Sequence, residues 1–191
     1  MRPMHAPASL ANQFLIAVPG MDDPNFNGGV ALLCHHSAEG AMGLLLNRAS
    51  DFILGELMAQ MGIHAADPAL AATPVLAGGP VEPERGFVLH SPDGGRWEST
   101  FEVSEQIHLT TSRDILEAMA RGQGPRQAVV ALGYSGWGAL QLEGELREHV
   151  WLSVDASPDI VFDLPLDARW RAATRLIGID PEALASYSGH A

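Results

Sequence analysis

Short apolar runs alternate with turn residues in the first part of the chain. The runs 14–18, 30–34 and 43–46 are nearly continuous and of strand length, and Pro-Gly, Asp-Pro and Glu-Gly pairs separate them. A continuous apolar run bounded by turn residues is typical of a strand that is buried on both faces. The pattern therefore predicts three buried strands before residue 47.

The apolar spacing becomes helical from Phe52 to Met61, where Ser50 or Asp51 can cap the start and Gly62 follows the end. A second helix is expected after Ser112, with its apolar positions on one face and Gly122 at its end. Further helices are expected over about 139–147 and 166–177, and after an Asp180 cap with Pro181 as the first helical residue.

The remaining apolar segments predict more strands. Segments 86–90 and 96–103 flank a Pro-Asp-Gly-Gly turn and predict a hairpin. Segments 127–132, 150–154 and 160–162 are expected to be buried strands as well. Hairpins followed by strand-helix-strand units indicate a mixed sheet with helices packed on it, of the α/β or α+β class.

The chain is expected to form one domain over 12–191, preceded by a flexible segment 1–11. A doubly wound dinucleotide-binding fold is disfavoured, because the first strand leads into Pro19-Gly20-Met21-Asp22 and not into a Gly-x-Gly-x-x-Gly turn.

Composition excludes several chemistries. The 191 residues contain 11 arginines and no lysine, against 23 acids, for a net charge of −12. Without lysine there is no Schiff base, no Walker nucleotide site and no Ser-Lys dyad. The negative field disfavours direct DNA binding. No apolar run approaches the ~20 residues that span a bilayer, so we expect a cytoplasmic protein without membrane contact.

The segment Gly133-Tyr134-Ser135-Gly136-Trp137-Gly138 carries the most suggestive chemistry. A serine between an apolar strand and a helix resembles a nucleophile elbow, although Trp137 stands where that motif requires glycine. A triad would also need a downstream histidine, either His149 or His190. We favour a tight structural turn.

Cys34-His35-His36 is a second candidate, for metal binding or thiol activation, and His36 is expected to share a strand face with Cys34. Its spacing matches no established metal motif, and we predict no metal and no cofactor. Gly78-Gly79-Pro80 could cradle an anion, but close backbone approach is the favoured explanation.

Gln141, Glu143 and Glu145 fall on the helix expected after the glycine-rich segment. At about 100° per residue, Glu143 and Glu145 point about 160° apart, so they do not form an acid/base dyad.

Several segments together resemble the AlgH/YqgE family of bacterial proteins. They are 14–21, 39–47, 78–81, 85–90, 114–116, 133–138, 141–143 and 151–152, in the family's order over nearly the whole chain. The resemblance implies a bifurcated sheet folded toward a pseudo-barrel and a putative transcriptional regulator label, without an established catalytic residue. This chain has His35 where the family usually has Glu, and Leu140 where it has Gly.

These observations favour a non-enzymatic binding or regulatory module that contacts a protein or a small ligand. The alternative is a small-molecule hydrolase that uses Ser135 or His36, so the sequence leaves open whether the protein is an enzyme. The predicted contact residues are Gly78, Gly79, His90, Ser135, Trp137, Gln141 and Glu143.

Overall fold

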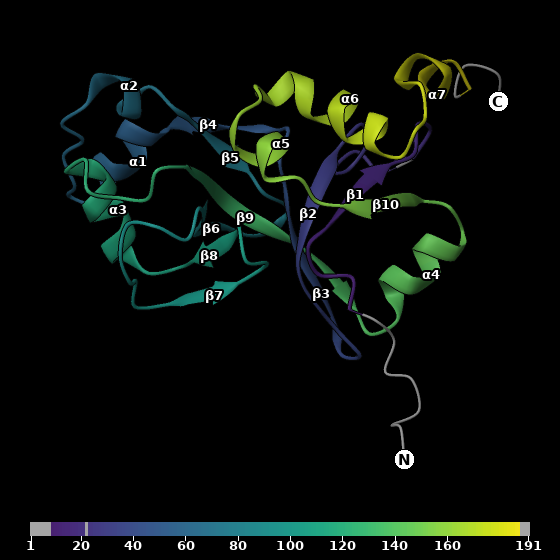
Figure 1. The fold of residues 1–191 in the computed structure, drawn as a ribbon, viewed down its shortest axis with the longest axis horizontal. Helices are drawn as coiled ribbons and strands as arrows, with labels where there is room; N and C mark the ends of the chain where they lie inside the picture. The colour runs from purple at the N-terminus through teal and green to yellow at the C-terminus, as the bar shows by residue number, and fades with distance from the viewer. Residues whose placement is uncertain (1–8, 22, 188–191) are drawn as a thin grey trace.

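In a computed structural model of the protein, residues 9–21 and 23–187 are described (Figure 1). The strands are β1 (Gln13–Ala17), β2 (Val30–Ser37), β3 (Gly40–Leu45), β4 (Ala49–Ile53), β5 (Pro74–Ala77), β6 (Val81–His90), β7 (Thr100–Glu102), β8 (His108–Thr110), β9 (Ala128–Gly138) and β10 (Trp151–Asp155). The helices are α1 (Leu54–Gln60), α2 (Pro68–Ala71), α3 (Arg113–Ala120), α4 (Gln141–Arg147), α5 (Pro158–Phe162), α6 (Leu166–Leu176) and α7 (Pro181–Tyr187). Most of the predicted flexible segment 1–11 lies outside the described residues, so it stays a prediction.

The strands form one curled sheet with the order β10-β1-β2-β3-β9-β6-β8-β7, and neighbours along this path are antiparallel. β5 adds a parallel partner to β9 and pairs with β4. Figure 1 shows β9 running from one half of the molecule into the other. Because β9 belongs to both halves, the sheet is bifurcated and curls into a half-barrel, and the predicted fold class is confirmed.

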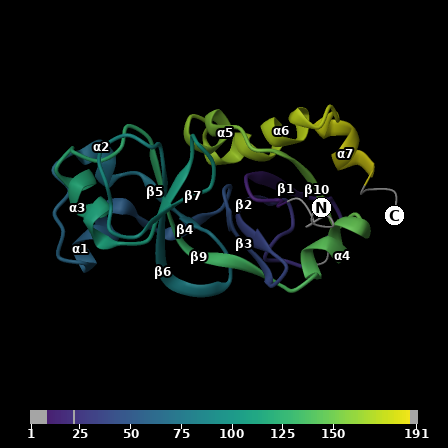
Figure 2. The same cartoon turned by 60° about the horizontal axis from the view of Figure 1, so that its bottom comes forward.

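Both faces of the sheet are covered. Alternate residues of β1 enter different cores: Phe14 and Ile16 face the cluster that includes α5 and α6, whereas Leu15 and Ala17 face the cluster around α4. A third core lies between the other half of the sheet and α1 and α3. Figures 1 and 2 show α6 lying over β1 and β2, with α1, α2 and α3 gathered at the opposite end. Burial on both faces explains why the first strands are continuous apolar runs.

The connection from β5 to β6 crosses β9. Ala131 pairs with Leu76 of β5 and also with Phe87 of β6, so these two strands occupy opposite edges of β9. The crossing leaves no space for side chains: a Cβ at Gly78 would lie 2.4 Å from the carbonyl oxygen of Gly133. The glycines at 78 and 79 therefore serve close backbone approach, which is the favoured sequence interpretation.

Three predicted elements are wrong. Residues 133–138 continue β9 and do not form a turn, because β3 pairs with 135–138. Segment 160–162 belongs to helix α5, which Pro158 starts. Segments 86–90 and 96–103 do not pair with each other, since β6 pairs with β8 and β9, while β7 pairs with β8.

The other predictions of elements are confirmed within a few residues. They comprise the strands near 14–18, 30–34, 43–46 and 150–154 and the helices near 52–61, 113–120, 139–147, 166–177 and after Asp180. None of the helices in residues 9–21 and 23–187 combines the length and the apolar character that crossing a membrane requires.

Candidate functional site

A hollow of about 830 Å³ opens at the mouth of the half-barrel. We call it the mouth groove. Strands β2, β3 and β9 supply one wall, and β6, β7 and β8 supply the other. Its size falls within the range of small-molecule sites, and barrel mouths are frequent places for such sites.

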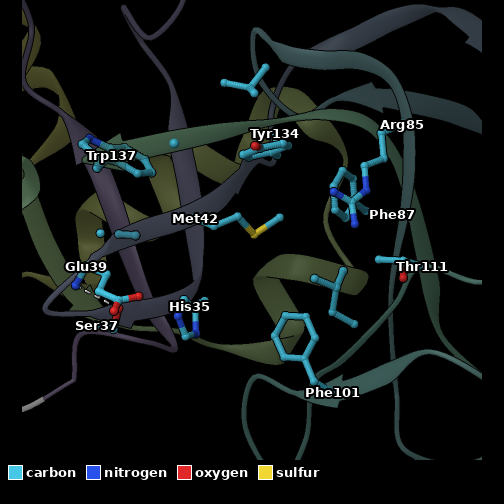
Figure 3. A pocket seen from close by; sticks show the side chains of 15 residues that line it. His35, Ser37, Glu39, Met42, Arg85, Phe87, Phe101, Thr111, Tyr134 and Trp137 are labelled. Atoms are coloured by element: carbon cyan, nitrogen blue, oxygen red, sulfur yellow. Dashed lines mark hydrogen bonds between the residues drawn. The ribbon is translucent and has the colours of Figure 1, made fainter. Parts of the chain in front are cut away.

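The walls of the mouth groove are apolar and aromatic. Figure 3 shows Phe101 and Tyr134 on opposite sides, with Met42 between them and Phe87 to one side. The rings of Phe87 and Tyr134 meet edge to face, with centroids 5.8 Å apart. Phe101 is 42% exposed on its three-residue strand and presents its ring to the groove. Gly136 adds only backbone to the lining.

Arg85 is the one arginine among the described residues that line the mouth groove. Its guanidinium lies 5.3 Å from the centroid of the Phe87 ring, in a cation–π contact. The Glu82 carboxylate lies 3.4 Å away, but both side chains are about half exposed, so this ion pair is weak. Glu39 and His35 lie across the groove (Figure 3). The groove can therefore hold an apolar group and an attached anion.

Ser135 does not have the surroundings of a nucleophile. Its side chain is fully buried and its hydroxyl donates to the Gly78 carbonyl at 3.1 Å. The hydroxyl thus fixes the crossing of β9. His149 lies in the turn before β10, and His190 lies outside the described residues. The nucleophile elbow, which the sequence offered only as a disfavoured alternative to a tight turn, is not formed because β9 continues through Ser135 as a paired strand.

The expectation that His36 shares a face with Cys34 is also wrong. A β-bulge between Leu33 and His35 reverses the alternation of β2, so His35, and not His36, reaches the mouth groove. Cys34 packs in the core, where burial raises the pKa of its thiol to about 12. A thiol with this pKa stays protonated and unreactive at neutral pH.

Both ring nitrogens of His36 are occupied. Nδ1 accepts from the Leu10 backbone N–H at 3.1 Å, so the proton lies on Nε2, which donates to Glu143 of α4. This hydrogen bond holds the pKa of the Glu143 carboxyl below its usual value. His36 therefore fastens β2 to α4, and neither nitrogen is available to act as a base.

A smaller hollow of about 240 Å³ lies on the other face of β9. We call it the indole hollow, because the rings of Trp137 and Trp151 meet there edge to face at 5.9 Å. One carboxylate oxygen of Glu145 accepts from both indole N–H groups, at 3.2 and 2.9 Å. Gln141 donates to the other carboxylate oxygen at 3.0 Å.

His90 is buried at the end of β6, outside both hollows. Its Nδ1 lies 2.7 Å from the Ser91 carbonyl oxygen, which can only accept, so Nδ1 carries the proton. Nε2 then accepts from the Thr110 hydroxyl at 2.7 Å. Burial lowers the pKa of His90, and the nearby His108 lowers it further. These effects outweigh the hydrogen bond to Ser91, which raises the pKa.

We expect His90 to make the protein less stable in mild acid. Because its pKa is lower in the folded chain than in the unfolded chain, the unfolded chain binds more protons as the pH falls below about 6.5. The stabilising contribution is complete above that pH and is lost as the pH falls toward the lowered pKa. Urea unfolding between pH 5 and 8 measures it, and His90→Gln should flatten this dependence.

The exposed His64 provides the control. His64→Gln should retain the pH dependence of the wild-type protein. An unchanged pH dependence in His90→Gln would contradict the role of the buried imidazole.

The predicted contact residues fall into separate places. Gly78, Gly79 and Ser135 meet at the crossing, where they are packed against backbone. Trp137 and Gln141 line the indole hollow, and of all the predicted residues only Trp137 also lines the mouth groove. The contact role of this set stays a prediction.

Sequence reasoning missed most of the mouth groove. Met42, Arg85, Phe101 and Tyr134 are single positions on four strands, and only the folded sheet brings them together. The one local signal was the large apolar side chain of Phe101 among polar neighbours. Within residues 9–21 and 23–187, no group of three or more His, Cys, Asp or Glu side chains could hold a metal ion.

Comparison with known proteins identifies the family. The model of the AlgH-like family matches residues 14–182. A protein of Xanthomonas campestris pv. campestris (strain B100) is 55% identical over 185 residues, covering 97% of this chain and 98% of the relative. A protein of Stenotrophomonas maltophilia (strain K279a) is 54% identical over 184 residues, covering 96% and 97%.

Solved structures agree with this assignment. The solution structure of the AlgH protein from Pseudomonas aeruginosa matches with a TM-score of 0.78 and 43% identity, and covers 100% of both chains. A crystal structure of a Corynebacterium diphtheriae protein matches in fold alone, with a TM-score of 0.69 at 19% identity over 98% of this chain and 94% of that one. The resemblance found in the sequence is confirmed, and the chain belongs to the AlgH-like family.

Proposed function

We propose that this protein is a non-enzymatic binding module that receives an apolar group of a ligand or partner protein in the mouth groove. The observation that carries the proposal is the open, largely apolar hollow in which Phe101 stays exposed although it faces Tyr134 and Met42. Arg85 at its edge favours a ligand with an anion next to its apolar part. Any regulation would follow from occupancy of this groove.

The geometry gives little support to the hydrolase alternative. A nucleophile needs a neighbouring base and access to substrate, but the Ser135 hydroxyl is buried against a carbonyl. His36 is held between Leu10 and Glu143. Neither residue is among those that line the mouth groove.

The same proposal places the protein in the cytoplasm and gives it no direct role on DNA. A single buried cysteine and no disulfide are ordinary for a reducing compartment. A chain of net charge −12 would repel the phosphate backbone. Regulation would thus proceed through a protein or metabolite contact.

Binding of anilinonaphthalene sulfonate, a fluorescent apolar anion, tests the proposal. We expect saturable binding to one site. Arg85→Ala should weaken it up to about fivefold, because a contact to a half-exposed charge contributes about 0.2–1 kcal/mol. Phe101→Ala should weaken it several-fold, because an aromatic contact contributes about 0.5–1.5 kcal/mol. Both side chains are exposed, so the fold should persist.

Leu176→Ala is the matched control. Leu176 is 47% exposed on α6 and lines neither hollow, so this change should leave the affinity for the probe intact. Equal affinity of all three variants, or no saturable binding to the wild-type protein, would overturn the proposed groove.

A further inference from the structure

The backbone hydrogen bonds of β3 alternate between its two neighbours. The Leu46 N–H donates to the carbonyl oxygen of Val30, on the β2 side of β3. The Leu45 N–H donates to the carbonyl oxygen of Gly78, on the opposite side. The odd-numbered residues of β3 therefore bond toward β9. In the register of these strands, Ala41 is paired with Trp137 and Gly43 with Ser135.

It follows that Ser135 and Trp137 bond to β3, while the N–H and C=O of Gly136 point away from it. Gly138 confirms this direction, because its N–H takes the Gln141 side chain as acceptor at 2.9 Å and not β3. Residues 136 and 138 thus present their backbone on the outer edge of β9.

No strand in the described part of the chain covers this edge at Gly136. β6 leaves β9 after the pair Val81–Tyr134, because the chain crosses to β5 at that point. Gly136 is exposed, and a Cβ there would meet only the Tyr134 ring at 3.5 Å and Val81 at 3.9 Å. A short open strand edge remains, of the kind to which another chain can add a strand.

This edge separates the two hollows. The mouth groove lies on the face of β9 that carries Tyr134. The indole hollow lies on the opposite face, where Glu145 of α4 and Trp151 of β10 contact Trp137. Gly136 and Trp137 belong to the lining of both hollows. Side chains of an added strand point alternately to the two faces. Successive side chains of a strand next to Gly136 would therefore enter one hollow and then the other.

The linings of the two hollows differ in charge. The indole hollow has the carboxylates of Asp23 and Glu145 beside two tryptophan rings, and no arginine or histidine among its lining residues. Carboxylates and indole faces attract a guanidinium or an ammonium group. The mouth groove is mainly apolar around Met42 and Tyr134. The net charge of −12 also favours a cationic partner.

We propose that β9 accepts, next to Gly136, an extended segment of a partner protein in which basic and apolar residues alternate. One residue of that segment exchanges both backbone hydrogen bonds with Gly136. Its apolar side chain enters the mouth groove, because directly paired residues point to the same face and position 136 shares the face of Tyr134. The basic neighbours on either side of it point to the opposite face, toward the indole hollow. This inference rests on the proposed function, because it assigns the apolar group in the mouth groove to a side chain of a partner protein.

A short capped peptide of alternating leucine and arginine serves as the probe, and calorimetry measures its affinity. A peptide of the same composition with the leucines and arginines in separate blocks controls for charge attraction alone. We expect the alternating peptide to bind at least about tenfold more tightly than the block peptide. In the complex, the Gly136 amide should become protected from hydrogen exchange.

Two substitutions at one position test the backbone contact. Gly136→Pro removes the outward N–H, which an edge strand tolerates, whereas Gly136→Ala keeps it. The proline variant should lose peptide affinity about tenfold or more relative to the alanine variant. If the proline variant does not fold, Gly136 exchange in the wild-type complex decides the question.

Anilinonaphthalene sulfonate separates this inference from the proposed function. If the probe binds but the two peptides bind equally or not at all, or if Gly136 stays unprotected, strand addition is overturned and the groove proposal stands. If the probe shows no site while the alternating peptide binds with Gly136 protected, the small-ligand test fails and strand addition is supported. Failure of both refutes both.

Discussion

Replacing Gly79 by alanine is expected to destabilise the protein by several kcal/mol and to leave little folded chain at 37 °C. A Cβ at this position would lie 2.2 Å from the carbonyl carbon and oxygen of Tyr134 and 2.4 Å from the Ser135 nitrogen. All three are backbone atoms of β9 and cannot rotate aside. Relieving this clash would require β9 to separate from the β5–β6 connection. Both halves of the sheet depend on this crossing. Urea unfolding and the yield of soluble protein measure the loss.

Gly62→Ala is the control for this prediction. Gly62 has a positive φ of 74°, but no atom lies within 4 Å of its virtual Cβ. Its replacement should therefore cost only the roughly 1 kcal/mol that alanine loses in a left-handed conformation. Similar losses in Gly62→Ala and Gly79→Ala would contradict the steric explanation.

Local sequence patterns predicted most elements of the fold, but failed where a distant segment determines the conformation. The glycines of 133–138 resemble a turn, yet they are strand positions at a crossing and at an open edge. That cause lies more than 50 residues away, at Gly78 and Gly79. The strand predicted at 160–162 is wrong for a local reason, because a short apolar run suits a strand or a helix and Pro158 starts a helix here.

The candidate site was less predictable than the fold. Ser135 and Gly136 drew attention to the right part of β9 for the wrong reason, because the structure has an exposed strand edge there and not an elbow. Face assignment failed at His36 because a bulge shifts the alternation by one residue, and the apolar pattern of β2 does not reveal the bulge. Arg85 and Phe101 reach the groove only through strand pairing.

The structure shows where part of the negative charge lies. The net charge of −12 disfavours DNA as a partner but names no binding surface, whereas the fold places Asp23 and Glu145 beside two indole rings at one face of β9. The integrity of this face depends on α4, which His36 and Glu145 connect to the sheet. Loss of packing at the indole hollow should thus affect both stability and binding.

Trp151→Ala is expected to cost about 3–5 kcal/mol of stability. The side chain is 1% exposed, packs edge to face against Phe26 and Trp137, and donates its indole N–H to Glu145 at 2.9 Å. Trp151→Phe keeps most of the volume and loses the hydrogen bond to a charged acceptor, so about 1.5–3 kcal/mol should be lost. Trp97 provides the contrast, because its buried indole N–H has no partner among the described residues, and Trp97→Phe forfeits no hydrogen bond. Urea unfolding of the three variants should therefore give the lowest free energy of unfolding for Trp151→Ala, a higher one for Trp151→Phe, and a value closest to wild type for Trp97→Phe. Equal losses in the two phenylalanine variants would show that the bond to Glu145 contributes nothing to stability.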